Sequence, residues 1–267
     1  MSNSALVKHT NISPYKTSPR NNTIQKVTIH HMAGNLSIET CGNVFQSSNS
    51  SSNYGVGTDG RVGMYVAEQD RSWCSSNANN DHQAVTMEVA NSSIGGDWPV
   101  SDTAYNAMID LTVDICWRNG INSLSWTGDS SGTLTIHKFF TATTCPGPYL
   151  ESRMPTIASS VNARLTTCQN IEADVITEAN RLQNQGIINT PSYWTHNFAA
   201  INYLGELIIN MGQATKNSTP VYIADIDAAI ARLESRGVIN TSSYWTANYS
   251  RLLYLEELII NVAKRLL

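Results

Sequence analysis

A pair of adjacent histidines, a third histidine and a cysteine stand at positions from which they could bind one metal ion. His30 and His31 end one apolar stretch, His137 ends another, and Cys145 follows His137 by eight residues. Imidazole and thiolate are ligands that zinc favours, and a site with three protein ligands leaves a fourth position for water. Such water ionises near neutral pH and attacks carbonyl carbons. The residue types therefore indicate a catalytic zinc site. Spacing alone leaves structural histidines as an alternative and does not choose between His30 and His31.

A glutamate within an apolar run is the second feature that could do chemistry. Glu88 lies in the middle of Ala-Val-Thr-Met-Glu-Val-Ala, residues 84–90. A buried carboxylate is costly unless it has a partner, and a positioned carboxylate can serve as a general base. The alternative is a strand residue whose side chain faces the solvent.

Rigid elements must bring these residues together, and the sequence pattern predicts them. Alternating residues predict short strands over 26–30, 84–90 and 134–137. We also expect a helix over 38–46, a hairpin over 54–66 that turns at Thr58-Asp59-Gly60, a helix from Ser101 to about Asn119 closed by Gly120, and a helix from about 150 to 168. Residues 1–23 are polar and predicted to be irregular. Strands mixed with helices at these lengths indicate an α/β domain.

The sequence around the candidate ligands resembles a known family. Val-Thr-Ile-His-His-Met-Ala-Gly at 27–34 is similar to the first signature of the zinc-dependent N-acetylmuramoyl-L-alanine amidases (type 2), a superfamily that includes the peptidoglycan recognition proteins. Ile136-His137 with Cys145-Pro-Gly is similar to the second signature. The hairpin and the Glu88 strand lie between them in the family's order. The resemblance covers about residues 20–165 and implies a mixed β-sheet flanked by helices.

The resemblance implies which residues hold the metal. His30, the first histidine after the apolar strand residues, corresponds to the first zinc ligand, and His137 and Cys145 correspond to the other two. His31 would then flank the site as a packed or hydrogen-bonded group. The cysteine must be a thiolate to bind, so zinc uptake would depend on pH.

The resemblance also implies two catalytic residues. Glu88 matches a glutamate that acts as general base beside the metal in related bacterial and phage amidases. Thr143 stands where some members carry a lysine and others a threonine, so its hydroxyl would donate a hydrogen bond to the tetrahedral intermediate. The implied reaction is hydrolysis of the amide between N-acetylmuramic acid and L-alanine by zinc-activated water.

The C-terminal part differs in kind, because it contains an internal repeat with an offset of 51. Leu182-x3-Gly186-Ile-Ile-Asn-Thr recurs as Leu233-x3-Gly237-Val-Ile-Asn-Thr, and a Tyr-Trp pair follows each copy. Each unit is predicted to be helix, turn, helix, with the glycine ending the first helix. We therefore expect a catalytic domain over 1–168 and a small all-α domain over 169–267, with repeats at about 171–212 and 222–263 and a polar linker at 213–220.

The repeats are similar to those at the ends of clostridial and related phage endolysins, which implies cell-wall binding. The pairs Tyr193-Trp194 and Tyr244-Trp245 could stack on sugar rings. The alternative is that they are core aromatics, which we expect for at least one ring of each pair. Dimerisation through the repeats, giving a homo-oligomer, is a second alternative.

Composition and charge limit the possible partners and cellular location of the protein. The chain has 17 basic and 21 acidic residues without a basic cluster, which argues against nucleic acid as a partner. No apolar stretch is long enough for a membrane span, and the N-terminus lacks the pattern of a signal peptide. We expect synthesis in the host cytoplasm and action on the wall after holin-type release, as for a phage endolysin of clostridia or related bacteria. The odd number of cysteines, five, argues against a disulfide scaffold but leaves a Cys41–Cys74 pair open.

Two other functions are compatible with the sequence. One is a peptidoglycan-binding protein without catalysis, and the other is a zinc hydrolase of another wall amide bond. Non-catalytic relatives typically lose the cysteine or the first histidine, whereas His30, His137 and Cys145 are all present here. The complete ligand set therefore favours the amidase.

Overall fold

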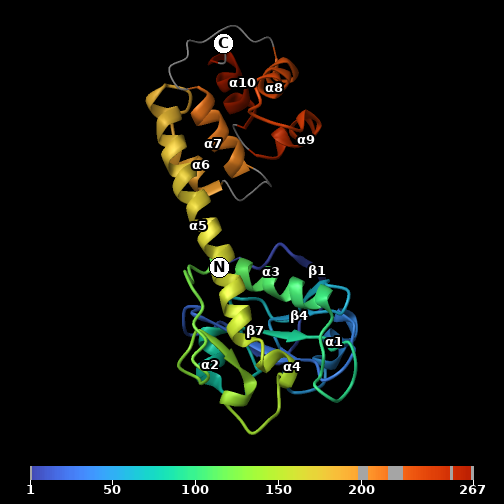
Figure 1. Cartoon of the computed structure of the whole chain (residues 1–267). Helices are drawn as coiled ribbons and strands as arrows, with labels where there is room; N and C mark the ends of the chain where they lie inside the picture. The colour runs from blue at the N-terminus through green and yellow to red at the C-terminus, as the bar shows by residue number, and fades with distance from the viewer. Residues whose placement is uncertain (1, 198–203, 216–224, 253–254, 266–267) are drawn as a thin grey trace. The chain divides into compact units, whose positions relative to one another are not determined.

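The computed structural model describes residues 2–197, 204–215, 225–252 and 255–265 (Figure 1). The chain forms two compact units, Met1–Thr166 and Thr167–Leu267. No helix within these described ranges is long and apolar enough to cross a membrane.

The first unit is built on a six-stranded mixed sheet with the order β1-β5-β4-β7-β3-β8. Its strands are β1 (Val7–Thr10), β3 (Lys26–His31), β4 (Tyr54–Val56), β5 (Val62–Met64), β7 (Ala84–Val89) and β8 (Leu134–Ile136). Strand β3 runs parallel to both β7 and β8, whereas β4 and β5 form the predicted antiparallel hairpin. A separate two-stranded sheet pairs β2 (Lys16–Thr17) with β6 (Arg71–Ser72). The predicted mixed sheet is confirmed.

Helices flank this sheet. They are α1 (Ile38–Val44), α2 (Ala78–Gln83), α3 (Asp102–Arg118), the 3-10 helix η1 (His137–Phe139), α4 (Pro148–Glu151) and α5 (Met154–Asn184). Helix α3 begins and ends as predicted, because the Ser101 hydroxyl accepts a hydrogen bond from the Ala104 N–H at 3.2 Å and Gly120 has φ +70°. Side chains of α3 and of the first turns of α5 join the strands in one apolar core.

Two predictions about the first unit are wrong. Residues 1–23 contain a strand, since Val7–Thr10 pairs in parallel with β5 at the edge of the sheet; the strand is short and only half-buried, so its apolar signal is weak. The helix predicted to end at about 168 continues to Asn184. No glycine or proline lies between Pro155 and Gly186, and Gly186, with φ +67°, is the first residue that favours a helix end.

A buried ion pair ties the hairpin to α3. The Glu68 side chain is fully buried and accepts hydrogen bonds from the Tyr54 hydroxyl at 2.6 Å, from Arg118 Nη2 at 2.7 Å and from Asn119 Nδ2 at 2.9 Å. Tyr54 therefore has a structural role at the start of β4. Arg118 is the cation that hydrogen-bonds to this carboxylate, so its loss would remove two of the hydrogen bonds that Glu68 accepts.

We expect Arg118→Met to destabilise the protein by about 3–5 kcal/mol, because it removes the cation that hydrogen-bonds to the buried Glu68 carboxylate. Urea unfolding followed by circular dichroism measures the loss. Arg164→Met is the matched control, since Arg164 pairs with Asp110 where both side chains are about half exposed, and exposed pairs contribute about 1 kcal/mol or less. Equal losses in the two variants would contradict the importance of the buried pair.

The second unit is helical. It contains the last turns of α5 and then α6 (Pro191–Asn197), α7 (Leu204–Ala214), α8 (Ile226–Ser235), α9 (Ser242–Asn248), the 3-10 helix η2 (Tyr249–Arg251) and α10 (Leu255–Arg265). Helices α9 and α10 begin 51 residues after α6 and α7, respectively. Residues 225–265 hold three α-helices instead of the predicted two, because Leu252 adopts an extended conformation between α9 and α10. Residues 216–220 of the predicted linker lie outside the described ranges.

The aromatic pairs divide between core and surface. Trp194 and Trp245 are buried in the core of the second unit, whereas Tyr193 and Tyr244 are half-buried beside it. The expectation that one ring of each pair is a core aromatic is therefore confirmed. The two tyrosines keep part of each ring at the surface.

Candidate metal centre and active site

The candidate site lies at one edge of the sheet, where parallel strands end. Strand β3 ends at His31, and Glu88 of β7 lies beside His30 in the parallel register. Strand β8 ends at Ile136, so His137 follows it directly as the first residue of η1. Because the carboxyl ends of parallel strands meet at one edge of an open sheet, residues more than a hundred positions apart converge there.

His30, His137 and Cys145 form a tight cluster. One donor atom from each lies within 4.8 Å of the others. The His30 and His137 ring centroids are 4.7 Å apart, and Cys145 Sγ lies 3.6 Å from His30 Nδ1. Ligands at about 2.0–2.3 Å in a tetrahedral zinc site are separated from one another by roughly 3.3–3.8 Å. The separation of the cysteine and histidine donors therefore fits a shared zinc ion.

The electrostatic state of these residues also fits a metal. The His30 nitrogen that faces Cys145 is Nδ1, and the Nε2 atom of His137 is buried and has no hydrogen-bond partner among the described residues. Burial lowers the pKa of both imidazoles and raises the pKa of the Cys145 thiol. Neutral imidazoles are the form that binds zinc, and a nearby cation stabilises the thiolate. The donor set is therefore suited to a divalent cation.

Glu88 lies beside this cluster and shares its surroundings with Cys74. Its Oε1 accepts a weak hydrogen bond from Cys74 Sγ at 3.8 Å, and its buried Oε2 has no partner within the described part of the chain. Burial raises the pKa of Glu88 to about 8. The alternative of a strand glutamate whose side chain faces open solvent does not hold, because Glu88 is only partly exposed and its Oε2 is buried. Donor atoms of His30, Cys74 and Glu88 also lie within 4.8 Å of one another.

The sequence pattern did not identify Cys74 as a site residue. Cys74 belongs to an irregular loop, which the buried Asp81 carboxylate anchors by accepting hydrogen bonds from the N–H groups of Cys74 and Ser75 at 3.0 and 3.1 Å. All five cysteines are described, and none forms a disulfide, so the open Cys41–Cys74 pairing does not occur. Only the fold brings Cys74 to Glu88.

The other predicted residues lie around the cluster. Thr143 Oγ1 accepts a hydrogen bond from the Cys145 N–H at 3.2 Å, which holds the cysteine loop and leaves the hydroxyl proton free to point elsewhere; its role toward an oxyanion stays a prediction. His31 is buried and packs edge-on against Trp98 at 5.1 Å, as expected for a flanking group. Gly147 completes this packing, because it has φ +84° and a Cβ there would lie 2.9 Å from Trp98.

A cavity of about 490 Å³ opens next to the cluster. The residues that line it include Glu88, His137, Cys74, Trp73 and Arg71. Its volume is in the range of about 300–1,000 Å³ that is common for ligand sites. His137 of the donor cluster and the candidate base Glu88 therefore line one cavity that a substrate can enter.

Part of the chain matches a known protein family, and several solved structures are similar to it. Residues 20–148 match the family model described as N-acetylmuramoyl-L-alanine amidase (Amidase_2). Similar solved structures include the N-acetylmuramoyl-L-alanine amidase LysC from Clostridium intestinale URNW, with 15% identity and a TM-score of 0.45 over 58% of this chain and 95% of that one. A selenomethionine derivative of AmpD has 14% identity and a TM-score of 0.46 over 58% and 96% of the two chains. The PlyG catalytic domain has 16% identity and a TM-score of 0.46 over 58% and 93%. A comparison with curated protein sequences found no match.

Proposed function

We propose that the chain is a zinc-dependent hydrolase of the bond between N-acetylmuramic acid and L-alanine in peptidoglycan, because residues 20–148 match the model of the N-acetylmuramoyl-L-alanine amidase family. The observation that carries this proposal is the convergence of His30, His137 and Cys145 at the sheet edge, beside the cavity that Glu88 lines. The family match supports a peptidoglycan amidase, and the donor cluster supports zinc as its cofactor.

The proposed mechanism assigns each residue one task. His30, His137 and Cys145 would hold zinc, which when bound polarises a carbonyl and promotes ionisation of water. The Glu88 carboxylate accepts a proton from the attacking water and delivers it to the departing amine nitrogen. The carbon–nitrogen bond breaks, leaving a lactyl carboxylate on the sugar and a free amine on L-alanine. Thr143 is our candidate donor to the developing oxyanion.

The position of Glu88 suits this role. In the metal-free chain burial raises the pKa of Glu88 to about 8, and a divalent cation bound beside it would favour the ionised form, which is the form that accepts a proton. Its Oε2, which has no partner among the residues that the structure describes, leaves an acceptor for a water proton. A peptidoglycan-binding protein without catalysis would need neither the ligand set nor this carboxylate, which is why we favour the enzyme.

We expect digestion of purified peptidoglycan to create new N-terminal alanine residues and free muramic lactyl groups, detected by mass spectrometry. The reason is that only cleavage of the sugar–peptide amide yields both products. A parallel digest with Glu88→Gln is the control for chemical background. New amine termini on other residues would instead indicate a hydrolase of another wall amide bond, and new reducing ends would indicate a glycosidase.

We also propose that the second unit binds the cell wall. Deleting residues 172–267 should reduce binding to whole cells at least about tenfold and leave the zinc content unchanged. All three candidate ligands and the apolar core of the first unit, which extends to Leu165, lie before the deletion. Sedimentation with cells and metal analysis of the same samples test this. Undiminished binding of the shortened chain would refute the wall-binding role.

Two aspects of the biological setting are separate proposals. The endolysin role, with synthesis in the host cytoplasm and release through a holin-type lesion, is tested by coexpression with a pore-forming membrane protein. Lysis should occur only when both proteins are present.

A homo-oligomer formed through the repeats is tested by light scattering of the full chain, which gives the molar mass directly.

A further inference from the structure

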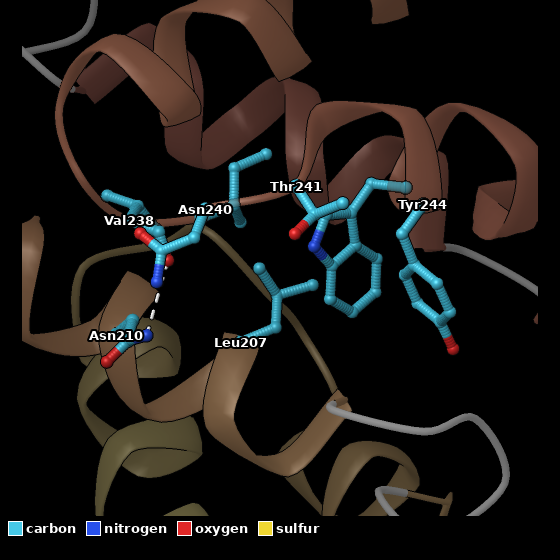
Figure 2. Close-up of a pocket in the computed structure, with 8 residues that line it drawn as sticks. Leu207, Asn210, Val238, Asn240, Thr241 and Tyr244 are labelled. Atoms are coloured by element: carbon cyan, nitrogen blue, oxygen red, sulfur yellow. Dashed lines mark hydrogen bonds between the residues drawn. The ribbon is translucent and has the colours of Figure 1, made fainter.

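The second unit contains two cavities built from equivalent residues. The first, of about 500 Å³, is lined by Leu207, Asn210, Val238, Asn240, Thr241 and Tyr244, among others (Figure 2). The second, of about 440 Å³, is lined by Ile187, Asn189, Thr190, Tyr193, Leu258 and Asn261, among others. Every residue of one set corresponds to a residue of the other set at an offset of 51. The repeat in the sequence is thus also a repeat of cavities.

Each cavity takes its walls from both repeats. In the first, Asn210 of α7 donates a hydrogen bond from Nδ2 to the Val238 carbonyl at 3.2 Å (Figure 2). In the second, Asn261 of α10 donates from Nδ2 to the Ile187 carbonyl at 3.5 Å. The last helix of each repeat therefore closes the cavity that begins at the turn of the other, so neither repeat alone forms a complete cavity.

The turns that shape the cavities have the same backbone geometry. Gly186 and Gly237 both have φ +67°, which ends the preceding helix. The next N–H then donates back to the helix, from Ile187 to Leu182 and from Val238 to Leu233, both at 2.9 Å. This rigid ending places each Asn-Thr pair and the following tyrosine at equivalent positions around the two cavities.

The lining indicates the chemistry of the ligand. None of the described residues that line either cavity is charged, which disfavours phosphates and the charged groups of peptides. A half-buried tyrosine ring at each cavity offers an apolar face, and neighbouring asparagine and threonine side chains offer amide and hydroxyl groups. An aromatic face with neutral hydrogen-bonding groups matches a pyranose, which has a C–H face and a rim of hydroxyls.

We propose that the two cavities are equivalent saccharide sites and that one chain binds two units of wall glycan at once. This proposal rests on the proposed wall-binding role and specifies its ligand class and residues. When two linked sites engage one polymer, the second binding event is intramolecular and can strengthen binding by about 10²–10⁴. A repeating glycan is the kind of ligand that can occupy both sites.

The test uses the full chain and two probes: peptidoglycan stripped of other polymers by hydrofluoric acid, and isolated wall polysaccharide. We expect Tyr193→Ala and Tyr244→Ala each to weaken sedimentation with one of these probes at least about tenfold, and the double variant to abolish it. Asn189→Ala with Asn240→Ala, at exposed positions, should weaken it without affecting the core. Ser243→Ala, which lines neither cavity, is the control, and thermal melts verify folding.

The possible outcomes separate the proposals. If wild type binds and the double tyrosine variant binds equally, the saccharide sites are wrong while wall binding stands. If one tyrosine alone accounts for all binding, the equivalence of the two sites is wrong. If wild type binds neither probe, both the wall-binding role and the saccharide sites are wrong. The proposed amidase activity is then tested separately by the release of alanine from soluble muropeptides.

Discussion

Cys145→Ala and His30→Ala should each yield a folded protein that retains no zinc and releases no N-terminal alanine from peptidoglycan. The three candidate donors lie within 4.8 Å of one another, so loss of one leaves two ligands, which is too few for a stable catalytic zinc site. Because a metal contributes several kcal/mol to stabilisation of charge in the transition state, the rate should fall by at least about a thousandfold. Plasma mass spectrometry for zinc and amine release, measured on the same samples, test both effects.

Two other cysteines supply the controls. Cys116 is buried in the apolar core on α3, so Cys116→Ala should lower stability slightly and leave zinc and activity intact. Cys74→Ala distinguishes the two overlapping clusters. The cluster of His30, Cys74 and Glu88 has only His30 in common with the proposed zinc site. It should retain one zinc per chain. If Cys74→Ala loses the metal while Cys145→Ala keeps it, the ion is held by His30, Cys74 and Glu88 instead. Activity that survives complete loss of zinc would overturn the mechanism.

The clustering of His30, His137 and Cys145 could be predicted because the sequence signals of these residues are local. Each histidine follows a short apolar strand, and parallel pairing of β3 with β7 and β8 carries the strand ends to one edge. The resemblance then chose His30 over His31, which spacing could not do. In the structure His30 contacts Cys145, whereas His31 packs against Trp98.

What the sequence missed depends on contacts between distant segments. Cys74 reaches Glu88 through a loop held by Asp81, and no periodic pattern marks such a loop. Strand β1 forms because it can pair with β5 at the edge of the sheet. Its four residues are at most half-buried, so their sequence alone does not predict this pairing. The repeat predicted two similar units, but not that Asn210 and Asn261 would each close a cavity begun by the other repeat. Shared cavities are a property of the folded pair.

Glu88→Gln should reduce amidase activity by about 10²–10⁴ while the protein keeps its zinc. The amide has nearly the same shape as the carboxylate but cannot accept the proton of the attacking water, and general base catalysis typically contributes this factor. The loss differs in kind from that in Cys145→Ala, where metal and activity disappear together. Measuring zinc content and the initial rate of alanine release in both variants distinguishes the base from the ligands.

Stability gives an independent check that Glu88→Gln acts on chemistry and not on folding. Burial raises the pKa of Glu88 to about 8, so the folded state disfavours the charged carboxylate, and metal-free protein loses stability as the pH rises from about 4.5 toward 8. Glutamine carries no charge, so the metal-free variant should melt at no lower temperature than metal-free wild type at pH 8. A variant that is stable, loaded with zinc and inactive identifies Glu88 as the base. A variant that is stable, loaded with zinc and as active as the wild type would show that another group accepts the proton. Cys74 would be the next residue to test, because its thiol contacts Glu88.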